Sequence, residues 1–112
     1  MNIIALLLAL IMVESSGNDL AKGDIDSFYG PAYGCMQITP AVVSEVNHEY
    51  GDNYTHEDMF NRDISIDVFI KYTNIYCGED ASFKERCIRW NPGDKDYWNK
   101  ISVELDKMNV AY

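Results

Sequence analysis

The sequence has few basic residues: nine Lys and Arg stand against 18 Asp and Glu, and the formal net charge is −9. Proteins bind nucleic acids through Lys and Arg side chains that neutralise phosphates, so this composition argues against a nucleic-acid partner. Three cysteines are too few for a disulfide-scaffolded domain. The two histidines, His48 and His56, lack partners at metal-ligand spacing. We therefore expect no metal site and no cofactor.

The chain also lacks an apolar run long enough to cross a bilayer, which requires about 20 residues. Its longest such run is Ile3–Val13 (IIALLLALIMV). A chain of 112 residues is too short for a dinucleotide-binding domain with a separate substrate domain, and 47% hydrophobic residues are too many for a disordered segment. Because no repeat, low-complexity segment or linker is visible, we predict a single domain over residues 1–112.

The apolar run has two interpretations. A secretory signal peptide contains an apolar stretch of this length, but here no Lys or Arg precedes it and no clear A-x-A-like cleavage site follows it. A buried core helix is equally compatible, because Ala and Leu have high helix propensity. The pattern of the run alone does not choose between them.

Further helices are predicted by apolar periodicity and by end signals. Thr39-Pro40 is a typical helix start, and this helix would end at Gly51. Residues 63–77 fit both a strand-like and a helical repeat, but their length favours a helix. Ser82 and Glu85 are spaced as a capping box for a helix that runs to Trp90.

A last helix carries one apolar stripe, and the stretch 19–33 is rich in Gly, Asp and Tyr without a helical period. The stripe consists of Trp98, Ile101, Leu105 and Met108. We predict a mostly helical α+β domain with a loop or short hairpin after the first helix.

Glu14 occupies an unusual position at the C-terminal end of a wholly apolar helix. The partial negative charge of a helix C-terminus and an apolar environment both disfavour an ionised carboxylate, so we predict a raised pKa for Glu14. A raised pKa keeps a carboxyl protonated near neutral pH, as a general acid requires.

Three segments occur in a recognisable order: ESSGN at 14–18, AYGCMQITP at 32–40 and RWNPG at 89–93. Together they resemble the soluble lytic transglycosylases and goose-type lysozymes, which cleave peptidoglycan. In that group an apolar helix ends in a catalytic Glu within E-S-x-G-N, and G-x-M-Q-I-x-P follows. A Tyr-Asn-x-Gly turn then precedes the last helix. The resemblance favours a lysozyme-like fold and a core helix over a signal peptide.

The resemblance implies a role for each matching residue. Glu14 would be the general acid and then the general base, and Ser15 would fix the carboxylate or the neighbouring turn. Gln37 would line the groove and bind sugar substituents, and Met36 would pack beneath the glycan. Trp90 and Asn91 would take the place of the Tyr-Asn pair.

Departures from the family pattern affect the same positions. Trp90 lacks the hydroxyl with which the family's Tyr reaches the catalytic carboxylate, but it can stack on a sugar ring and donate from its indole nitrogen. Asp63-Ile64 replaces an Asn-Ile pair, and Cys35 replaces an apolar residue.

The resemblance implies a single-carboxyl mechanism that cleaves between N-acetylmuramic acid and N-acetylglucosamine and leaves 1,6-anhydro ends. Lysozyme-type hydrolysis is the alternative, and Asp24 or Asp26 is then the candidate second carboxylate. A non-catalytic secreted binding protein, with residues 1–17 as a signal peptide, is a further alternative.

Other features concern stability and setting. Cys77 and Cys87 would form a disulfide if the protein works outside the cytoplasm, and two free thiols are an equal alternative. Tyr29, Tyr33, Tyr97 and Trp98 are candidate stacking surfaces along a glycan groove.

Since peptidoglycan is anionic, the charge of −9 opposes long-range attraction between the domain and its substrate. We expect an extracytoplasmic site of action and delivery by a larger virion or secretion assembly.

Overall fold

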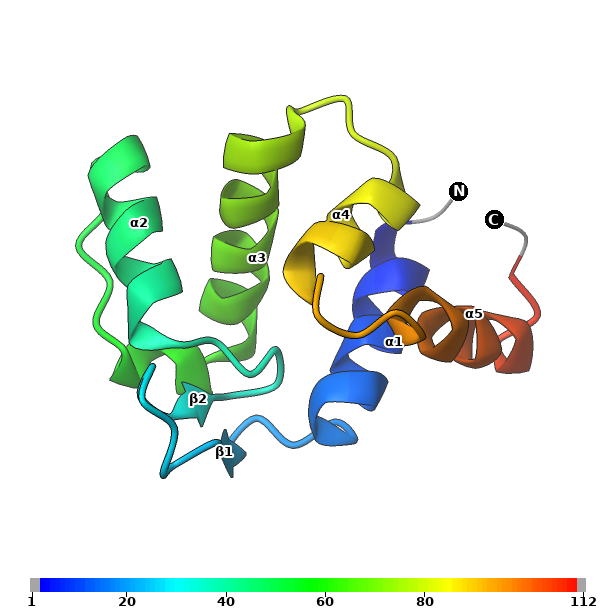
Figure 1. Ribbon diagram of the computed structural model, residues 1–112, viewed down its shortest axis with the longest axis horizontal. Helices are drawn as coiled ribbons and strands as arrows, with labels where there is room; N and C mark the ends of the chain where they lie inside the picture. The colour runs from blue at the N-terminus through cyan, green and yellow to red at the C-terminus, as the bar shows by residue number, and fades with distance from the viewer. Residues whose placement is uncertain (1–2, 111–112) are drawn as a thin grey trace.

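The computed structural model describes residues 3–110. The first element of this part of the chain is the helix α1 (Ile3–Ser15). It is followed by a hairpin, four α-helices and a 3-10 helix, which are arranged as Figure 1 shows. These elements, in chain order, are β1 (Lys22–Gly23), β2 (Ala32–Tyr33), α2 (Pro40–Tyr50), the 3-10 helix η1 (Glu57–Phe60), α3 (Arg62–Cys77), α4 (Phe83–Trp90) and α5 (Tyr97–Lys107). The mostly helical fold with a short hairpin, consistent with a lysozyme-like fold, is as predicted.

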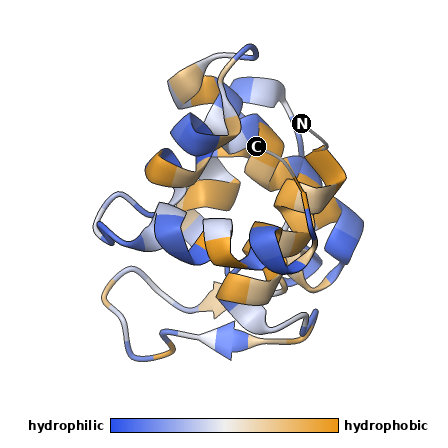
Figure 2. Ribbon diagram, turned by 90° about the vertical axis from the view of Figure 1, so that its right-hand side faces the viewer, coloured by the Kyte–Doolittle hydropathy of each residue, from blue (hydrophilic) through white to orange (hydrophobic). Residues whose placement is uncertain are grey.

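The hydrophobic core is built around α1, which packs against α5. Leu6, Ala9 and Leu10 are fully buried. The apolar run is therefore a core helix in this structure. Hydrophobic patches lie beside hydrophilic ones along the helices in Figure 2, as expected for helices that bury one face.

One face of α1 remains uncovered within the described part of the chain. Ile4, Leu8 and Met12 follow one another at intervals of four residues and are between 43 and 63% exposed. None of the helices in residues 3–110 is long and apolar enough to cross a membrane.

The remaining predicted helices begin and end close to the expected residues. Residues 62–77 form a helix throughout, and Asn61 caps it by accepting a hydrogen bond from the Ile64 amide at 3.1 Å. The Ser82 hydroxyl caps α4 by accepting from the Glu85 amide at 3.2 Å. The Glu85 carboxylate accepts from the Ser82 hydroxyl, at 3.0 Å.

Two local features of the sequence take a definite form in the structure. The hydroxyl of Thr39 makes no capping hydrogen bond, although α2 does begin at Pro40, whose fixed φ suits a first helical residue. Of the two alternatives for Cys77 and Cys87, the structure has the two free thiols. The Cys77 thiol donates to the Glu85 carbonyl at 3.8 Å, and Cys87 is buried in the core, where burial raises its pKa to about 12.

The segment after α1 forms a small antiparallel hairpin in which Lys22 pairs with Tyr33 and Gly23 with Ala32. Arg62, at the start of α3, ties this segment down by donating to Asp19 at 2.7 Å and to the Gly17 carbonyl at 2.9 Å. The hairpin, shown at the bottom of Figure 1, therefore stays close to the C-terminal end of α1.

Candidate active site

A cavity of about 430 Å³ opens where α1, the hairpin, α2, α3 and α4 meet. It is lined by Glu14, Asp24, Ala32, Gln37, Thr39, Val42, Tyr72, Trp90 and Asn91. Four of the residues proposed from sequence for catalysis or substrate binding, Glu14, Gln37, Trp90 and Asn91, are thus brought to one cavity although they come from three separate segments.

The Glu14 carboxyl group is in an environment that favours its protonated form. Burial raises the pKa of Glu14 above its ordinary value, and the negative charge of Asp24 raises it further. The hydrogen bond from Tyr97 and the charge of Lys100 act in the opposite direction, but the net shift is upward. This electrostatic environment is the one expected for a general acid.

Tyr97 is the direct partner of Glu14, and its hydroxyl donates to Oε1 at 2.5 Å. The Tyr97 side chain is only 3% exposed, at the first residue of α5. Burial and the charge of Glu14 raise the pKa of Tyr97, so its hydroxyl stays protonated and can only donate to the carboxylate. Sequence reasoning placed Tyr97 among candidate glycan-stacking residues, and its burial excludes that role.

The segment 33–38 is a tight loop that aims Gln37 at the cavity. Tyr33 and Ile38 exchange two backbone hydrogen bonds of 2.9 Å, and Gln37 has a positive φ of 54°. The Gln37 side-chain amide donates to the Gly34 carbonyl at 2.9 Å. The side chain also occupies the space beside Gly23, where an added Cβ would lie 2.2 Å from Gln37 Oε1.

Ser15 joins this loop to the end of α1. Its hydroxyl lies 2.9 Å from the Cys35 carbonyl and 3.1 Å from the Ile11 carbonyl of its own helix, and it donates to these oxygens. Ser15 is expected to fix either the carboxylate of Glu14 or the neighbouring turn, and these hydrogen bonds fit the second of the two roles. The residue after Glu14 therefore sets the position of the loop that carries Gln37.

The opposite wall is formed by the end of α4. The Trp90 ring packs edge-on against Phe69, with centroids 4.8 Å apart, and against Tyr72 at 5.6 Å. Asn91 follows directly as the C-cap of α4. These aromatic contacts hold Trp90 as a fixed surface beside the catalytic candidate.

The comparison with known families agrees with this geometry. A family model, the Transglycosylase SLT domain, matches residues 3–102, from α1 into α5. The chain belongs to the SLT domain family. No curated protein and no solved structure matches at a significant level. Family membership implies that this SLT domain acts on peptidoglycan and cleaves its glycan strands as a transglycosylase.

Not every residue proposed from sequence reaches the cavity of the SLT domain. Met36 is fully buried in the core and does not line the cavity, and its side chain supports the loop from within. Asp24 lines the cavity, whereas Asp26 is exposed and is not among the lining residues. Within residues 3–110, no three His, Cys, Asp or Glu side chains form a metal-binding group.

We predict that Tyr97→Phe lowers kcat/KM of the SLT domain roughly thirtyfold, since a hydrogen bond to a charged group contributes on the order of 2 kcal/mol. Loss of the donor raises the pKa of Glu14 further, so the alkaline limb of the pH profile shifts to higher pH. The pH dependence of kcat/KM measures both effects.

Tyr54→Phe is the matched control, because its hydroxyl donates to Asp67 at 2.8 Å and Tyr54 does not line the cavity. It removes the same kind of bond and should leave the pH profile unchanged. An unchanged profile in Tyr97→Phe would show that the hydroxyl does not act on Glu14.

Proposed function

We propose that this SLT domain cleaves the bond between N-acetylmuramic acid and N-acetylglucosamine by a single-carboxyl mechanism that leaves 1,6-anhydro ends. The observation that carries the proposal is the Glu14 carboxyl group: it lines the cavity, its pKa is raised by burial, and Tyr97 holds it in place. One side chain can then serve as acid and as base in successive steps.

In the first step, protonated Glu14 donates its proton to the glycosidic oxygen, and the bond from that oxygen to the muramoyl C1 breaks. The substrate's own acetamido group stabilises the positive charge that develops at C1. In the second step, ionised Glu14 takes the proton from the muramoyl C6 hydroxyl while O6 bonds to C1. Glu14 ends protonated, and no water is consumed.

The other cavity residues provide the groups that a sugar chain needs. Trp90 offers an aromatic face for stacking on a sugar ring, and its position is fixed by Phe69 and Tyr72. Gln37 and Asn91 provide amide groups that both donate and accept hydrogen bonds, which suits sugar hydroxyl and acetamido groups.

The test is digestion of purified peptidoglycan followed by mass spectrometry of the released fragments. The proposal expects fragments with 1,6-anhydro ends. Fragments with reducing ends would instead establish hydrolysis. Binding to glycan strands without any released fragment would contradict catalysis and support a binding protein.

Asp24 is the residue on which a hydrolytic mechanism would depend, because it is the second carboxylate among the cavity-lining residues. We predict that Asp24→Asn leaves anhydro ends as the product and shifts the alkaline limb of kcat/KM to lower pH. The shift follows because the charge of Asp24 raises the pKa of Glu14. Mass spectrometry and a pH profile measure the two effects.

Asp26→Asn is the matched control, since Asp26 lies two residues away and is exposed outside the cavity. It should change neither the products nor the pH profile. If Asp24→Asn abolished a hydrolysed product that the unaltered chain forms, Asp24 would be the residue that activates water.

The charge of −9 supports delivery by a larger assembly to an extracytoplasmic site of action. An acidic domain gains no long-range attraction toward an anionic wall, so its encounter with the substrate would be slow in free diffusion. A virion or secretion assembly that carries the domain to the wall removes this disadvantage.

A further inference from the structure

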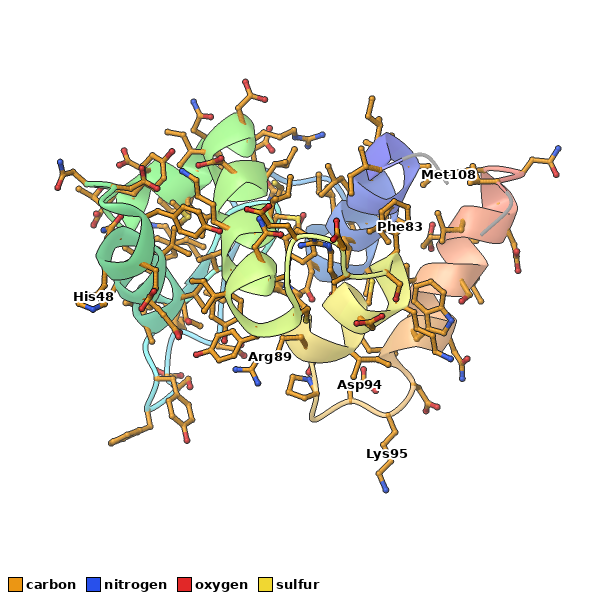
Figure 3. All side chains as sticks on the ribbon, turned by 90° about the horizontal axis from the view of Figure 1, so that it is seen from above. His48, Phe83, Arg89, Asp94, Lys95 and Met108 are labelled. Carbon is orange, nitrogen blue, oxygen red and sulfur yellow. The ribbon has the colours of Figure 1, made fainter. Side chains whose placement is uncertain are left out.

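Arg89 places the positive charge of its guanidinium group near the catalytic cavity. It lies on α4, one residue before Trp90, and its guanidinium carbon lies over the Tyr76 ring, 3.5 Å from the centroid. The same carbon is 5.9 Å from the centroid of the Tyr72 ring. Figure 3 labels Arg89 at the edge of the molecule, next to α3 and α4.

Arg89 has no acidic partner within residues 3–110, because no carboxylate oxygen of these residues lies within 4.0 Å of its nitrogens. Arg62, Lys71, Lys100 and Lys107 all make such ion pairs. The buried Nε of Arg89 also has no hydrogen-bond partner in the described structure. In a chain with twice as many acidic as basic residues, this guanidinium is left without a counter-charge of its own.

The aromatic rings beneath Arg89 hold it in place without neutralising its charge. Tyr76 is fixed from α2, because its hydroxyl donates to the Glu45 carboxylate, and its ring lies 5.1 Å from that of Tyr72. The Nε of Arg89 is buried, so a carboxylate would bind through the two terminal N–H₂ groups of the guanidinium, which can form two parallel hydrogen bonds to it.

The position of Arg89 relates it to the substrate. Tyr72 lines the catalytic cavity, and its ring stacks beside that of Tyr76, which lines a second hollow of about 460 Å³ together with Arg89. Glu85 also lines this second hollow, and its carboxylate accepts a hydrogen bond from the Ser82 hydroxyl. Ile88 and Pro92 contribute an apolar wall to that hollow. N-acetylmuramic acid carries a peptide on its lactyl group, and this peptide has free carboxylates. A peptide that leaves the cavity across Tyr72 passes the guanidinium, whose carbon is 5.9 Å from the centroid of that ring.

We propose that Arg89 binds a carboxylate of the peptide stem on the muramic acid at the cleavage site. The domain then prefers strands that carry stems over strands without them. This inference rests on the proposed function, because the sugar in the cavity positions the stem.

The test compares kcat/KM on two substrates made from one preparation of peptidoglycan freed of teichoic acids: strands with tripeptide stems, and strands from which an amidase has removed the stems. The unaltered chain is expected to cleave the stem-bearing strands about tenfold better, which corresponds to about 1.4 kcal/mol. In Arg89→Gln the ratio should fall to about one. Arg89→Lys, which keeps the charge but not the planar fork, should give an intermediate ratio.

Lys95→Gln is the matched control. Lys95 is an exposed cation that lines a different hollow, between α4 and α5, and it has no carboxylate of residues 3–110 within 4.0 Å. This variant should keep the preference of the unaltered chain. A preference lost in Lys95→Gln and kept in Arg89→Gln would place the stem in that hollow and overturn the proposal.

The outcomes also separate this inference from the proposed function. Equal cleavage of both substrates by the unaltered chain would overturn the role of Arg89 and leave the glycan chemistry standing. Cleavage of neither substrate would overturn both. A second measurement needs no turnover: tryptophan fluorescence should report tighter binding of a disaccharide tripeptide than of the bare disaccharide, and Arg89→Gln should remove this difference.

Discussion

Glu14→Gln is expected to reduce the cleavage of peptidoglycan about a thousandfold, the usual scale for loss of a general acid and base. The amide has nearly the same shape as the carboxyl group, so it fits the same space beside Tyr97. It has no proton to give to the glycosidic oxygen and cannot take one from the C6 hydroxyl. Release of soluble fragments from purified peptidoglycan measures the loss, and a variant that still clears cell walls would refute the assignment of Glu14.

The same variant should be more stable at neutral pH, which separates a catalytic defect from misfolding. Because the pKa of Glu14 is raised in the folded state above its ordinary value of 4.5, the native chain binds more protons than the unfolded chain between the two values. Stability therefore falls as the pH rises through this window. The neutral amide of the Glu14→Gln variant has no such cost, so the melting temperature of the variant should exceed that of the unaltered chain at pH 8, and the two should converge at low pH.

Gly34→Ala is expected to have the largest effect on stability, a loss of at least about 3 kcal/mol. Gly34 has a φ of +83°, which a residue with a side chain adopts only at a cost. An added Cβ would also lie 1.9 Å from the carbonyl oxygen of Met59 in η1, an atom of the backbone that cannot move aside alone. Urea unfolding measures the loss.

Gly51→Ala is the matched control, because Gly51 has a similar φ of +71° but nothing lies within 4 Å of its added Cβ. It should cost roughly 1 kcal/mol, the conformational part alone. Equal losses in the two variants would mean that the contact with Met59 relaxes freely. A larger loss at Gly34 would show that close packing of the loop 33–38 on η1 is required for the fold around Gln37.

The helices and the catalytic candidate could be predicted from sequence because their signals are local. An apolar run that ends in Glu14 places a carboxyl group at a buried helix end, and Asn61 and Ser82 cap helices near where apolar periodicity begins. The order of three segments, which matches a family pattern, then allowed Gln37 and Trp90 to be predicted at the same site as Glu14.

The remainder depends on tertiary packing and on the direction of side chains. The contact between Tyr97 and Glu14 spans 83 positions of the chain, and no periodicity connects two residues so far apart. Met36 and Gln37 are neighbours in one motif, but the left-handed conformation of Gln37 directs its side chain to the cavity while Met36 points into the core. A motif specifies residue types and their spacing. It does not specify the backbone conformation that points two neighbouring side chains in different directions.

The packing of α1 against α5 also governs when the site comes into existence as the protein is made. The carboxyl group is in the first helix and its hydroxyl donor is in the last, so a growing polypeptide on the ribosome contains Glu14, Gln37 and Trp90 before it contains Tyr97. The acid gains its hydrogen-bond donor only when α5 has emerged. A truncated product that ends before α5 retains every motif and still lacks the finished site.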